Sequence, residues 1–395
     1  MADLYVGLMS GTSLDGVDAV LVEISPSSPT SPHASAATGT QPLPRIVHAV
    51  ALAYPAALKA AVLALCRKQA APLVELGRID VELARWYSRA VQQLLQECGV
   101  PASAVRAIGS HGQTVHHEPG GDTPFTLQLG DPNLLAVSTG VTVVADFRRR
   151  DMALGGQGAP LAPGFHDAVF RHPSRCRVVL NCGGIANISV LAPGRDCIGY
   201  DTGPANILMD AWVQSRAGLA YDQDGRWAQQ GQLIAPLLAR MRADPYFALP
   251  PPKSTGREHF NLAWIESHLE ASIDGVLTTS PAPGGAPLQA HADVQRTLLE
   301  LSAGTVADAI ARHAAGGDLL VAGGGAYNAA LLARLRALCP AWAVDTTAAL
   351  GIPPEHVEAT AFAVFAQRTL DGLTGNLPSV TGASRRCLLG GIYPP

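Results

Sequence analysis

Residues 6–21 have the sequence VGLMSGTSLDGVDAVL, in which two apolar stretches flank a polar turn. The stretch from Leu4 to Leu8 is short and apolar, as in a buried strand, and Val17 to Ile24 alternates like its partner. The connection MSGTSLDG has the small and polar residues of a tight turn. The pattern predicts a β-hairpin whose tip carries hydroxyl groups and a carboxylate.

The tip of this hairpin, Ser10 to Gly16, has the chemistry that phosphate requires. Glycine lets backbone N–H groups approach anionic oxygens, hydroxyls donate further bonds, and the Asp15 carboxylate can hold Mg²⁺ directly or through water. The same residue types also favour a plain hairpin turn for conformational reasons, so both interpretations stay open. The lysine and the glycine spacing of a P-loop or a dinucleotide fingerprint are missing.

Further along the first half, apolar spacing predicts a helix over residues 73–98 with a buried face. Apolar runs at 105–110 and 141–145 predict strands, and both end in polar clusters, at 111–114 and 146–151. We interpret the Gly- and Pro-rich segment 154–163 as the crossing between two domains, with a boundary near residue 148. Pro-rich segments at 25–44 and 278–287 are typical of surface loops.

The second half repeats the plan of the opening hairpin. Arg177 to Asn181 predicts a strand, Cys182 to Gly184 a turn, and Ile188 to Leu191 a second strand. Leu319 to Ala322 predicts another buried strand, followed by three glycines and a helix over Asn328 to Leu338. The repeat suggests two related domains facing one another. Each glycine turn fits either a phosphate or ribose contact or an ordinary tight connection.

Asp201 is the most informative carboxylate in the sequence. It follows the short segment Cys197 to Tyr200 and precedes Thr202-Gly203-Pro204, where Pro204 suits the first position of a helix. An aspartate at such a place is as often a helix cap as a catalytic group. The local pattern leaves the choice open.

Composition narrows the class of protein. A chain of 395 residues suits two domains, and no apolar run approaches the roughly 18 residues of a membrane-spanning helix. A formal charge of -4 gives no broad positive field, so we expect no nucleic-acid partner. The 7 cysteines lack paired spacing, and the N-terminus lacks a secretory pattern, so we expect a cytoplasmic protein with reduced thiols and no membrane partner.

Five segments together resemble the anhydro-N-acetylmuramic acid kinase family, and they occur in the family's order over most of the chain: VGLMSGTSLDGVDAVL (6–21), GSHGQTVHH (109–117), LNCGGIANIS (180–189), YDTGPAN (200–206) and AGGGAYN (322–328). The resemblance implies an α/β, two-domain actin-like or hexokinase-type (ribonuclease H-like) fold with an ATP cleft between duplicated domains. We expect domains over 1–148 and 149–395, with residues from about 380 to 395 packing back on the first.

The resemblance also implies a role for each motif. Asp201 corresponds to the family's general base, and Asp15 is the candidate for Mg²⁺. The sugar-pocket candidates are His111, Gln113, Asp146, Arg148 and Asp151, whereas Glu358 is interpreted as supporting the C-terminal helix. The implied ATP contacts are Gly11, Thr12, Ser13, Leu14, Asp15, Gly16, Val17 and Asp18, then Gly183, Gly184 and Asn187, and, beside adenosine, Gly323, Gly324 and Gly325.

The implied reaction uses ATP and Mg²⁺. Water adds to C1 of anhydro-N-acetylmuramic acid, the 1,6-anhydro bridge opens, and O6 receives the γ-phosphoryl group, as part of peptidoglycan recycling. Two alternatives remain at this point: a related kinase for a free hydroxyl of another sugar, and a non-kinase ATP-driven conformational module. The expected partner is a small molecule, and the sequence is also compatible with a homodimer.

Overall fold

The computed structural model describes residues 2–11, 14–26, 43–67, 71–270 and 288–395. Thr12 and Ser13 of the predicted phosphate turn lie outside these ranges, as do the predicted loop at 278–287 and most of the loop at 25–44. Within the described ranges, no helix is both long enough and apolar enough to cross a membrane.

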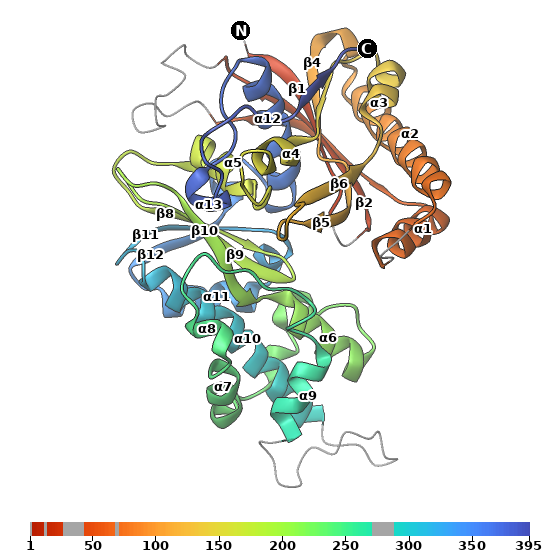
Figure 1. The fold of residues 1–395 in the computed structure, drawn as a ribbon. Helices are drawn as coiled ribbons and strands as arrows, with labels where there is room; N and C mark the ends of the chain where they lie inside the picture. The colour runs from red at the N-terminus through yellow and green to blue at the C-terminus, as the bar shows by residue number, and fades with distance from the viewer. Residues whose placement is uncertain (1, 12–13, 27–42, 68–70, 271–287) are drawn as a thin grey trace. The chain divides into compact units, whose positions relative to one another are not determined.

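The chain divides into two compact units (Figure 1). The first comprises Met1–Pro173, Leu350–Ile352 and His356–Pro395, and the second comprises Ser174–Ala349 and Pro353–Glu355. This division differs from the expected boundary near residue 148, and the expected crossing at 154–163 lies inside the first unit. The reason is packing: α5 (Ala162–Phe170) contacts α12 (Val357–Leu370), and both belong to the first unit.

The first unit is built on a six-stranded sheet with the order β13-β7-β4-β1-β2-β3. Strands β1, β4 and β7 run parallel, whereas β2 and β3 form antiparallel pairs, and the C-terminal β13 pairs antiparallel with β7. A separate hairpin joins β5 to β6. The strands are β1 (Asp3–Met9), β2 (Gly16–Ile24), β3 (Arg45–Ala53), β4 (Val105–Ser110), β5 (Gln113–Glu118), β6 (Phe125–Leu129), β7 (Val143–Ala145) and β13 (Gly391–Tyr393).

Two helices cover the opposite faces of this sheet. The predicted helix over 73–98 is α2 (Leu73–Cys98), whose apolar face packs on β2 and β3. On the other face α12 lies so close that a Cβ atom at Gly7 or Gly109 would stand 1.9 Å from a carbonyl oxygen of α12. Only glycine fits at these two positions. The remaining helices of the unit are α1 (Ala56–Arg67), α3 (Pro132–Thr139), α4 (Phe147–Met152) and α13 (Pro378–Thr381).

The second unit repeats this topology. Its sheet has the order β10-β9-β8-β11-β12, with β8, β11 and β12 parallel and β9 and β10 added antiparallel. The order and directions match those of β3-β2-β1-β4-β7, so the predicted duplicated two-domain α/β fold is confirmed. The strands are β8 (Arg177–Cys182), β9 (Ile185–Leu191), β10 (Ile198–Pro204), β11 (Gly317–Ala322) and β12 (Trp342–Thr346).

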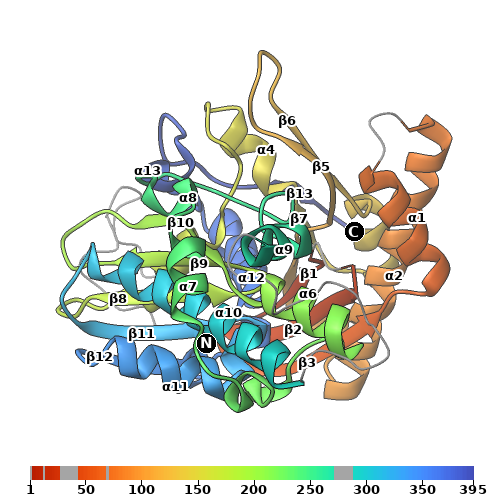
Figure 2. The same cartoon turned by 90° about the horizontal axis from the view of Figure 1, so that it is seen from below.

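Helix α10 (Leu288–Ala311) lies against β9 and β10, with α6, α7 and α11 packed beside it (Figure 2). Pro204 is the last residue of β10 and not, as expected, the first of a helix, because its segment continues the pairing with β9 and α6 begins two residues later, at Asn206. The helices of this unit besides α10 are α6 (Asn206–Ala217), α7 (Ala235–Arg242), α8 (Pro245–Ala248), α9 (Leu262–Glu270) and α11 (Ala329–Leu338).

Candidate active site

The turn between β1 and β2 is held in place by buried hydroxyl groups. Ser10 Oγ lies 3.0 Å from the carbonyl oxygen of Gly16, 2.6 Å from the Tyr54 hydroxyl and 2.5 Å from Gln113 Oε1. Leu14 has a positive φ of 57°, which is uncommon for a residue other than glycine. Such backbone conformations persist where the surroundings enforce them, often at binding sites.

Two predicted site residues meet at this turn. Gln113 is buried, and its Nε2 donates to the Gly11 carbonyl at 3.4 Å, so its side chain supports the turn from within. Asp15 is exposed, and Lys59 Nζ lies 2.9 Å from its Oδ1. The structure therefore presents the Asp15 carboxylate to solvent and keeps Gln113 beneath the turn.

A buried histidine and a half-buried arginine follow the ends of β4 and β7. Arg148 Nε and Nη2 donate to His111 Nε2 at 3.0 and 2.8 Å, and Arg148 Nη1 donates to the Gly158 carbonyl at 2.8 Å. Burial, and then the charge of Arg148, hold the pKa of His111 well below its usual range. His111 is therefore neutral, and its ring proton lies on Nδ1 because Nε2 accepts.

Two carboxylates accompany this pair. Asp146, just after β7, has a positive φ of 62°, and burial raises its pKa against the opposing charges of Arg149 and Arg150. Burial also raises the pKa of Glu358, in the first turn of α12, and the charge of Arg148 opposes that shift. Glu358 was interpreted from the sequence as a support for the helix, and no local pattern distinguishes it from any other first-turn glutamate. Only the tertiary structure shows that it shares the electrostatic surroundings of Arg148.

Asp151 has a different environment from the one expected. Its side chain is completely buried. Its Oδ2 accepts from the Gly158 N–H at 2.9 Å, and its Oδ1 accepts from Asn376 Nδ2 and Thr381 Oγ1, each at 2.8 Å. These bonds tie the segment after α4 to the C-terminal segment, so we leave Asp151 out of the proposed sugar site.

In the second unit, three polar residues form one row across neighbouring strands. Asn181 of β8 is the register partner of Asn187 of β9, which is in turn the partner of Asp201 of β10. Directly opposed residues of antiparallel strands share a face, with Cβ atoms roughly 5 Å apart. The pairing therefore brings together residues from two of the sequence motifs, and it places Asp201 inside a strand and not at a helix cap.

The surroundings of Asp201 make its carboxylate a stronger base than usual. The Thr255 N–H donates to Asp201 Oδ2 at 3.1 Å, the Tyr246 hydroxyl donates to the Asp201 carbonyl at 2.7 Å, and the Asp201 N–H donates to the Lys253 carbonyl at 3.1 Å. Burial raises the pKa of Asp201 to about 6, although the Thr255 bond opposes the shift. A carboxylate with this pKa is mostly ionised at neutral pH and accepts a proton readily.

The glycine turns of this unit pack on one another. Asn206 Nδ2 donates to the carbonyl oxygens of Cys182 and Gly183 at 3.1 and 2.9 Å, which joins the start of α6 to the turn after β8. Gly323 has a φ of 75°, and a Cβ atom there would lie 2.6 Å from Asn181 Oδ1. At Gly324, by contrast, a Cβ atom would meet nothing within 4 Å, so protein packing leaves open space beside this backbone.

That space belongs to a cavity of about 600 Å³ in the second unit. Its size falls in the range of roughly 300–1,000 Å³ that is typical of small-molecule sites. The sequence motifs supply its glycine turn and Asn206, whereas the loop after α6, which supplies the wall from Ala220 to Asp224, carries no recognisable motif. The lining residues include Asn206, Met209, Asp210, Tyr221, Asp222, Asp224, Gly324, Tyr327 and Asn328.

The cavity combines aromatic and acidic groups. Tyr221 and Tyr327 are exposed, which suits stacking against a planar base. Burial, and then the charge of Asp222, raise the pKa of Asp210 to about 6. Asp224 adopts a positive φ of 58°, and with Leu14 and Asp146 it makes up the set of described residues other than glycine with this backbone conformation. All three lie in the candidate site regions.

Comparison with known proteins identifies the family of the chain. The model of the family described as anhydro-N-acetylmuramic acid kinase matches residues 3–395. The chain is also similar to solved structures at low identity. The activator of the 2-hydroxyisocaproyl-CoA dehydratase from Clostridium difficile with bound ADPNP is 11% identical, with 93% of this chain and 94% of that chain covered and a TM-score of 0.41.

Two kinases of the ROK class are similarly distant. The ROK family glucokinase from Streptomyces griseus in complex with glucose and AMPPNP is 16% identical, with 91% and 99% of the two chains covered and a TM-score of 0.35. The ROK hexokinase from Thermus thermophilus is 14% identical, with 93% and 99% covered and a TM-score of 0.33. The assignment rests on the family match: the chain belongs to the anhydro-N-acetylmuramic acid kinase family and is a phosphotransferase that uses ATP on a small sugar substrate.

Proposed function

We propose that the protein converts anhydro-N-acetylmuramic acid, water and ATP into N-acetylmuramic acid 6-phosphate and ADP. The oxygen of water bonds to C1 while the C1–O6 bond of the anhydro bridge breaks. O6 then bonds to the γ-phosphorus of ATP, and ADP departs. One proton of the water stays on the new hydroxyl at C1, and the other passes to Asp201.

The proposal rests on the position of Asp201 in its strand and on its raised pKa. Its carboxylate lies mid-strand beside Asn187, caps no helix, and has a pKa raised to about 6 by burial. A general base performs best when its pKa lies near the working pH, because it is then both ionised and able to take up a proton.

The reaction needs no second carboxyl group as a general acid. Hydrolysis of an ordinary glycoside uses one carboxyl to activate water and another to protonate the departing oxygen. Here the departing O6 is phosphorylated instead of protonated. We therefore propose Asp201 as the base and assign no residue to the acid role.

We propose the glycine-bearing turns as the elements that bind the phosphates of ATP. Backbone N–H groups around Gly11 to Asp18, and around Gly183, Gly184 and Asn187, suit phosphate oxygens. The cavity of about 600 Å³ beside Gly324 suits adenosine, since tyrosine rings are available for the base and carboxylates for the ribose hydroxyls. The open space beside Gly324 fits a ligand that approaches the backbone closely.

The donor set also fits Mg²⁺. Magnesium is usually held by one or two carboxylates together with phosphate oxygens and water, and not by a closed protein cage. Asp15 offers an exposed carboxylate on the predicted phosphate turn, and no group of three His, Cys, Asp or Glu side chains in the described ranges forms such a cage. When bound with ATP, the ion supplies charge neutralisation on the transferred phosphoryl group.

For the sugar we propose His111, Asp146 and Arg148, with Gln113 acting through the turn that it supports. The neutral His111 holds Arg148 in a defined position, and Asp146 adds an acceptor for hydroxyl groups. The substrate is a product of peptidoglycan breakdown, so we further propose a role in cell-wall recycling. Because ATP and the released sugar are both available there, we propose the cytoplasm as the place of reaction.

The test is product analysis with the purified chain, ATP, magnesium and anhydro-N-acetylmuramic acid. Mass spectrometry should show the 6-phosphate, and in ¹⁸O-labelled water the label should appear at C1. Label in the transferred phosphate would exclude the ring-opening step. Equal turnover of a free, non-anhydro sugar would instead favour the related kinase without an anhydro requirement.

A further inference from the structure

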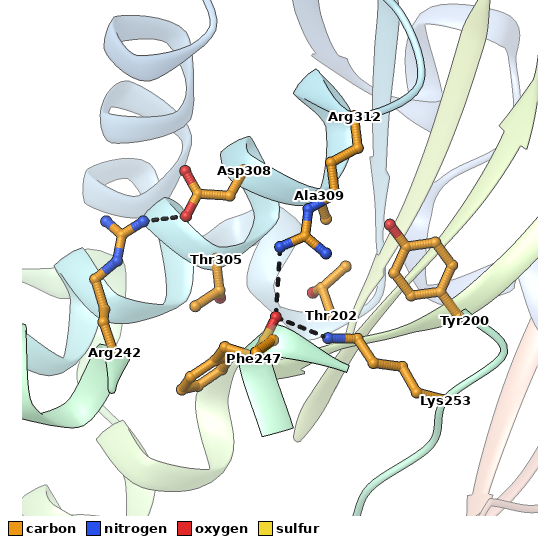
Figure 3. A pocket seen from close by; sticks show the side chains of 10 residues that line it. Tyr200, Thr202, Arg242, Phe247, Lys253, Thr305, Asp308, Ala309 and Arg312 are labelled. Atoms are coloured by element: carbon orange, nitrogen blue, oxygen red, sulfur yellow. Dashed lines mark hydrogen bonds and ion pairs between the residues drawn. The ribbon is translucent and has the colours of Figure 1, made fainter. Parts of the chain in front are cut away.

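A second cavity, of about 240 Å³, lies in the second unit behind the strand that carries Asp201 (Figure 3). Tyr200 of β10 lines it. Because consecutive residues of a strand point to opposite faces, the Asp201 side chain points away from this cavity. The other walls come from α7, α8, the segment after α8 and the end of α10.

Three cationic side chains line this cavity but only one carboxylate does. Arg242 pairs with Asp308. Arg312 and Lys253 have no carboxylate partner among the lining residues, and both donate to the Phe247 carbonyl, from Nη2 at 3.4 Å and from Nζ at 3.5 Å (Figure 3). The cavity therefore has an excess of two positive charges that face a neutral oxygen.

Arg312 is exposed and Lys253 is partly buried, so both charges are open to an anion from solvent. Two cations that converge on one carbonyl repel each other, and burial together with Arg312 lowers the pKa of Lys253. An anion between them would supply a charged acceptor to both, and charge-assisted hydrogen bonds are about twice as strong as neutral ones. The hydroxyls of Tyr200 and Thr305 also line the cavity and add donors for oxygen atoms.

We propose that this cavity binds a compact oxyanion, the phosphate or carboxylate group of a small metabolite, and that its occupancy controls how Asp201 is held. The volume is below the range of roughly 300–1,000 Å³ that is usual for drug-sized ligands, so it suits a small anion better than a nucleotide. The control of Asp201 rests on the proposed function, whereas binding of the anion does not.

The physical link is the segment from Tyr246 to Thr255. Lys253 Nζ donates to the Tyr246 carbonyl at 3.0 Å, and the Lys253 carbonyl accepts from the Asp201 N–H. The same segment delivers the Tyr246 hydroxyl and the Thr255 N–H to Asp201. An anion that draws Lys253 Nζ away from the Tyr246 and Phe247 carbonyls would shift this segment. The segment fixes the position of Asp201, so the shift would change how Asp201 is held.

Binding is tested first, with inorganic phosphate and the full chain, by isothermal titration calorimetry in saturating ADP and magnesium. Arg312→Gln should weaken phosphate binding about tenfold or more, because it removes a charge-assisted donor. Arg195→Gln, on an exposed turn before β10, makes the same charge change outside the cavity and should bind like the parent. A sulfate titration and a carboxylate such as acetate distinguish a phosphate-selective site from a general oxyanion site.

Coupling is tested by turnover at saturating ATP and sugar, where phosphate no longer competes at the nucleotide site. Phosphate should lower kcat in the parent and in Arg195→Gln but leave kcat of Arg312→Gln unchanged. Equal phosphate affinity in the parent and in Arg312→Gln would refute the proposed anion site. If phosphate binding depends on Arg312 but kcat does not change, the proposed effect on Asp201 is refuted. Binding is measured without turnover, so failure of the proposed reaction would be recognised separately.

Discussion

The two sheets share one strand order, yet two candidate carboxylates, one in helix α4 of the first unit and one in strand β10 of the second, have opposite surroundings. In the first unit, Asp151 is completely buried and accepts bonds on both oxygens from Gly158, Asn376 and Thr381. In the second unit, Asp201 accepts a bond from the Thr255 N–H, and burial raises its pKa to about 6. The same topology thus anchors one carboxylate and keeps another basic near neutral pH.

The turns after the first strand of each sheet show a similar contrast. The first is held by the side chains of Ser10 and Gln113. The second is held by backbone N–H groups at the start of α6 and by the side chain of Asn206. Duplicated topology therefore provides equivalent positions for turns, but different side chains make each turn rigid.

The largest effect on activity is expected from Asp201→Asn. This substitution keeps the shape of the side chain and an oxygen that can accept from the Thr255 N–H. Loss of a general base typically lowers the rate by about 100- to 10,000-fold. We expect kcat to fall by this amount, while calorimetry shows unchanged ATP binding. The control is Asp196→Asn, on the exposed turn before β10, and near-parent turnover in Asp201→Asn would refute the assignment.

A second test is Asp15→Asn in the turn of the first unit. If the Asp15 carboxylate faces the metal, its loss should raise KM for magnesium-ATP by about 10- to 100-fold and leave sugar binding unchanged. The exposed pair with Lys59 contributes little to stability, so the fold should be unaffected. Asp122→Asn, in the exposed turn between β5 and β6, serves as the control. Parent-like ATP kinetics would rule out this role.

The pKa of Asp201 gives a third test. A base must be ionised, so kcat/KM should rise with pH through about 6 and fall about tenfold for each unit below it. The free energy of unfolding should instead fall as the pH rises. The folded state holds the proton more tightly than the unfolded chain, so the parent loses up to about 3 kcal/mol between pH 4 and 7.

Asp201→Asn lacks this ionisation and should therefore unfold at a higher temperature than the parent above pH 6, with the advantage disappearing near pH 4. Differential scanning calorimetry across this range checks the sign. An activity profile with no inflection near pH 6, or a variant that is less stable at pH 8, would contradict the raised pKa.

The smallest effect should come from the glycine turn after β11. Gly324→Ala places a methyl group in open space, so the fold should be retained while KM for ATP rises about fivefold or more by crowding the ligand. Gly323→Ala should instead destabilise the protein by about 1–3 kcal/mol, because its φ is 75° and Asn181 is in the way. If the two variants behave alike, the turn has only a structural role.

The sequence by itself determined the hairpin of residues 6–21, the helix over 73–98 and the order of the five motifs. These features depend on local periodicity and on the conformational preferences of glycine and polar residues, so they are visible without a fold. The family assignment also follows from them, because motifs in a fixed order are a property of the chain.

Other conclusions needed the tertiary structure. The interpretation of Pro204 as a helix start was wrong because strand pairing with β9 overrides the local preference of proline. The electrostatic role of Glu358 had no sequence signal, and neither did the part of the cavity wall beside Gly324 that the loop after α6 supplies.

Only the tertiary structure decided which carboxylates are available for chemistry. Asp151 and Asp201 are both candidate site residues in the sequence, and nothing in the residue type separates their roles. Burial and hydrogen-bond partners from distant segments, Asn376 and Thr381 for one and Thr255 for the other, make the first an anchor and the second a base. Such partners are brought together by folding across the chain, and no local pattern encodes them.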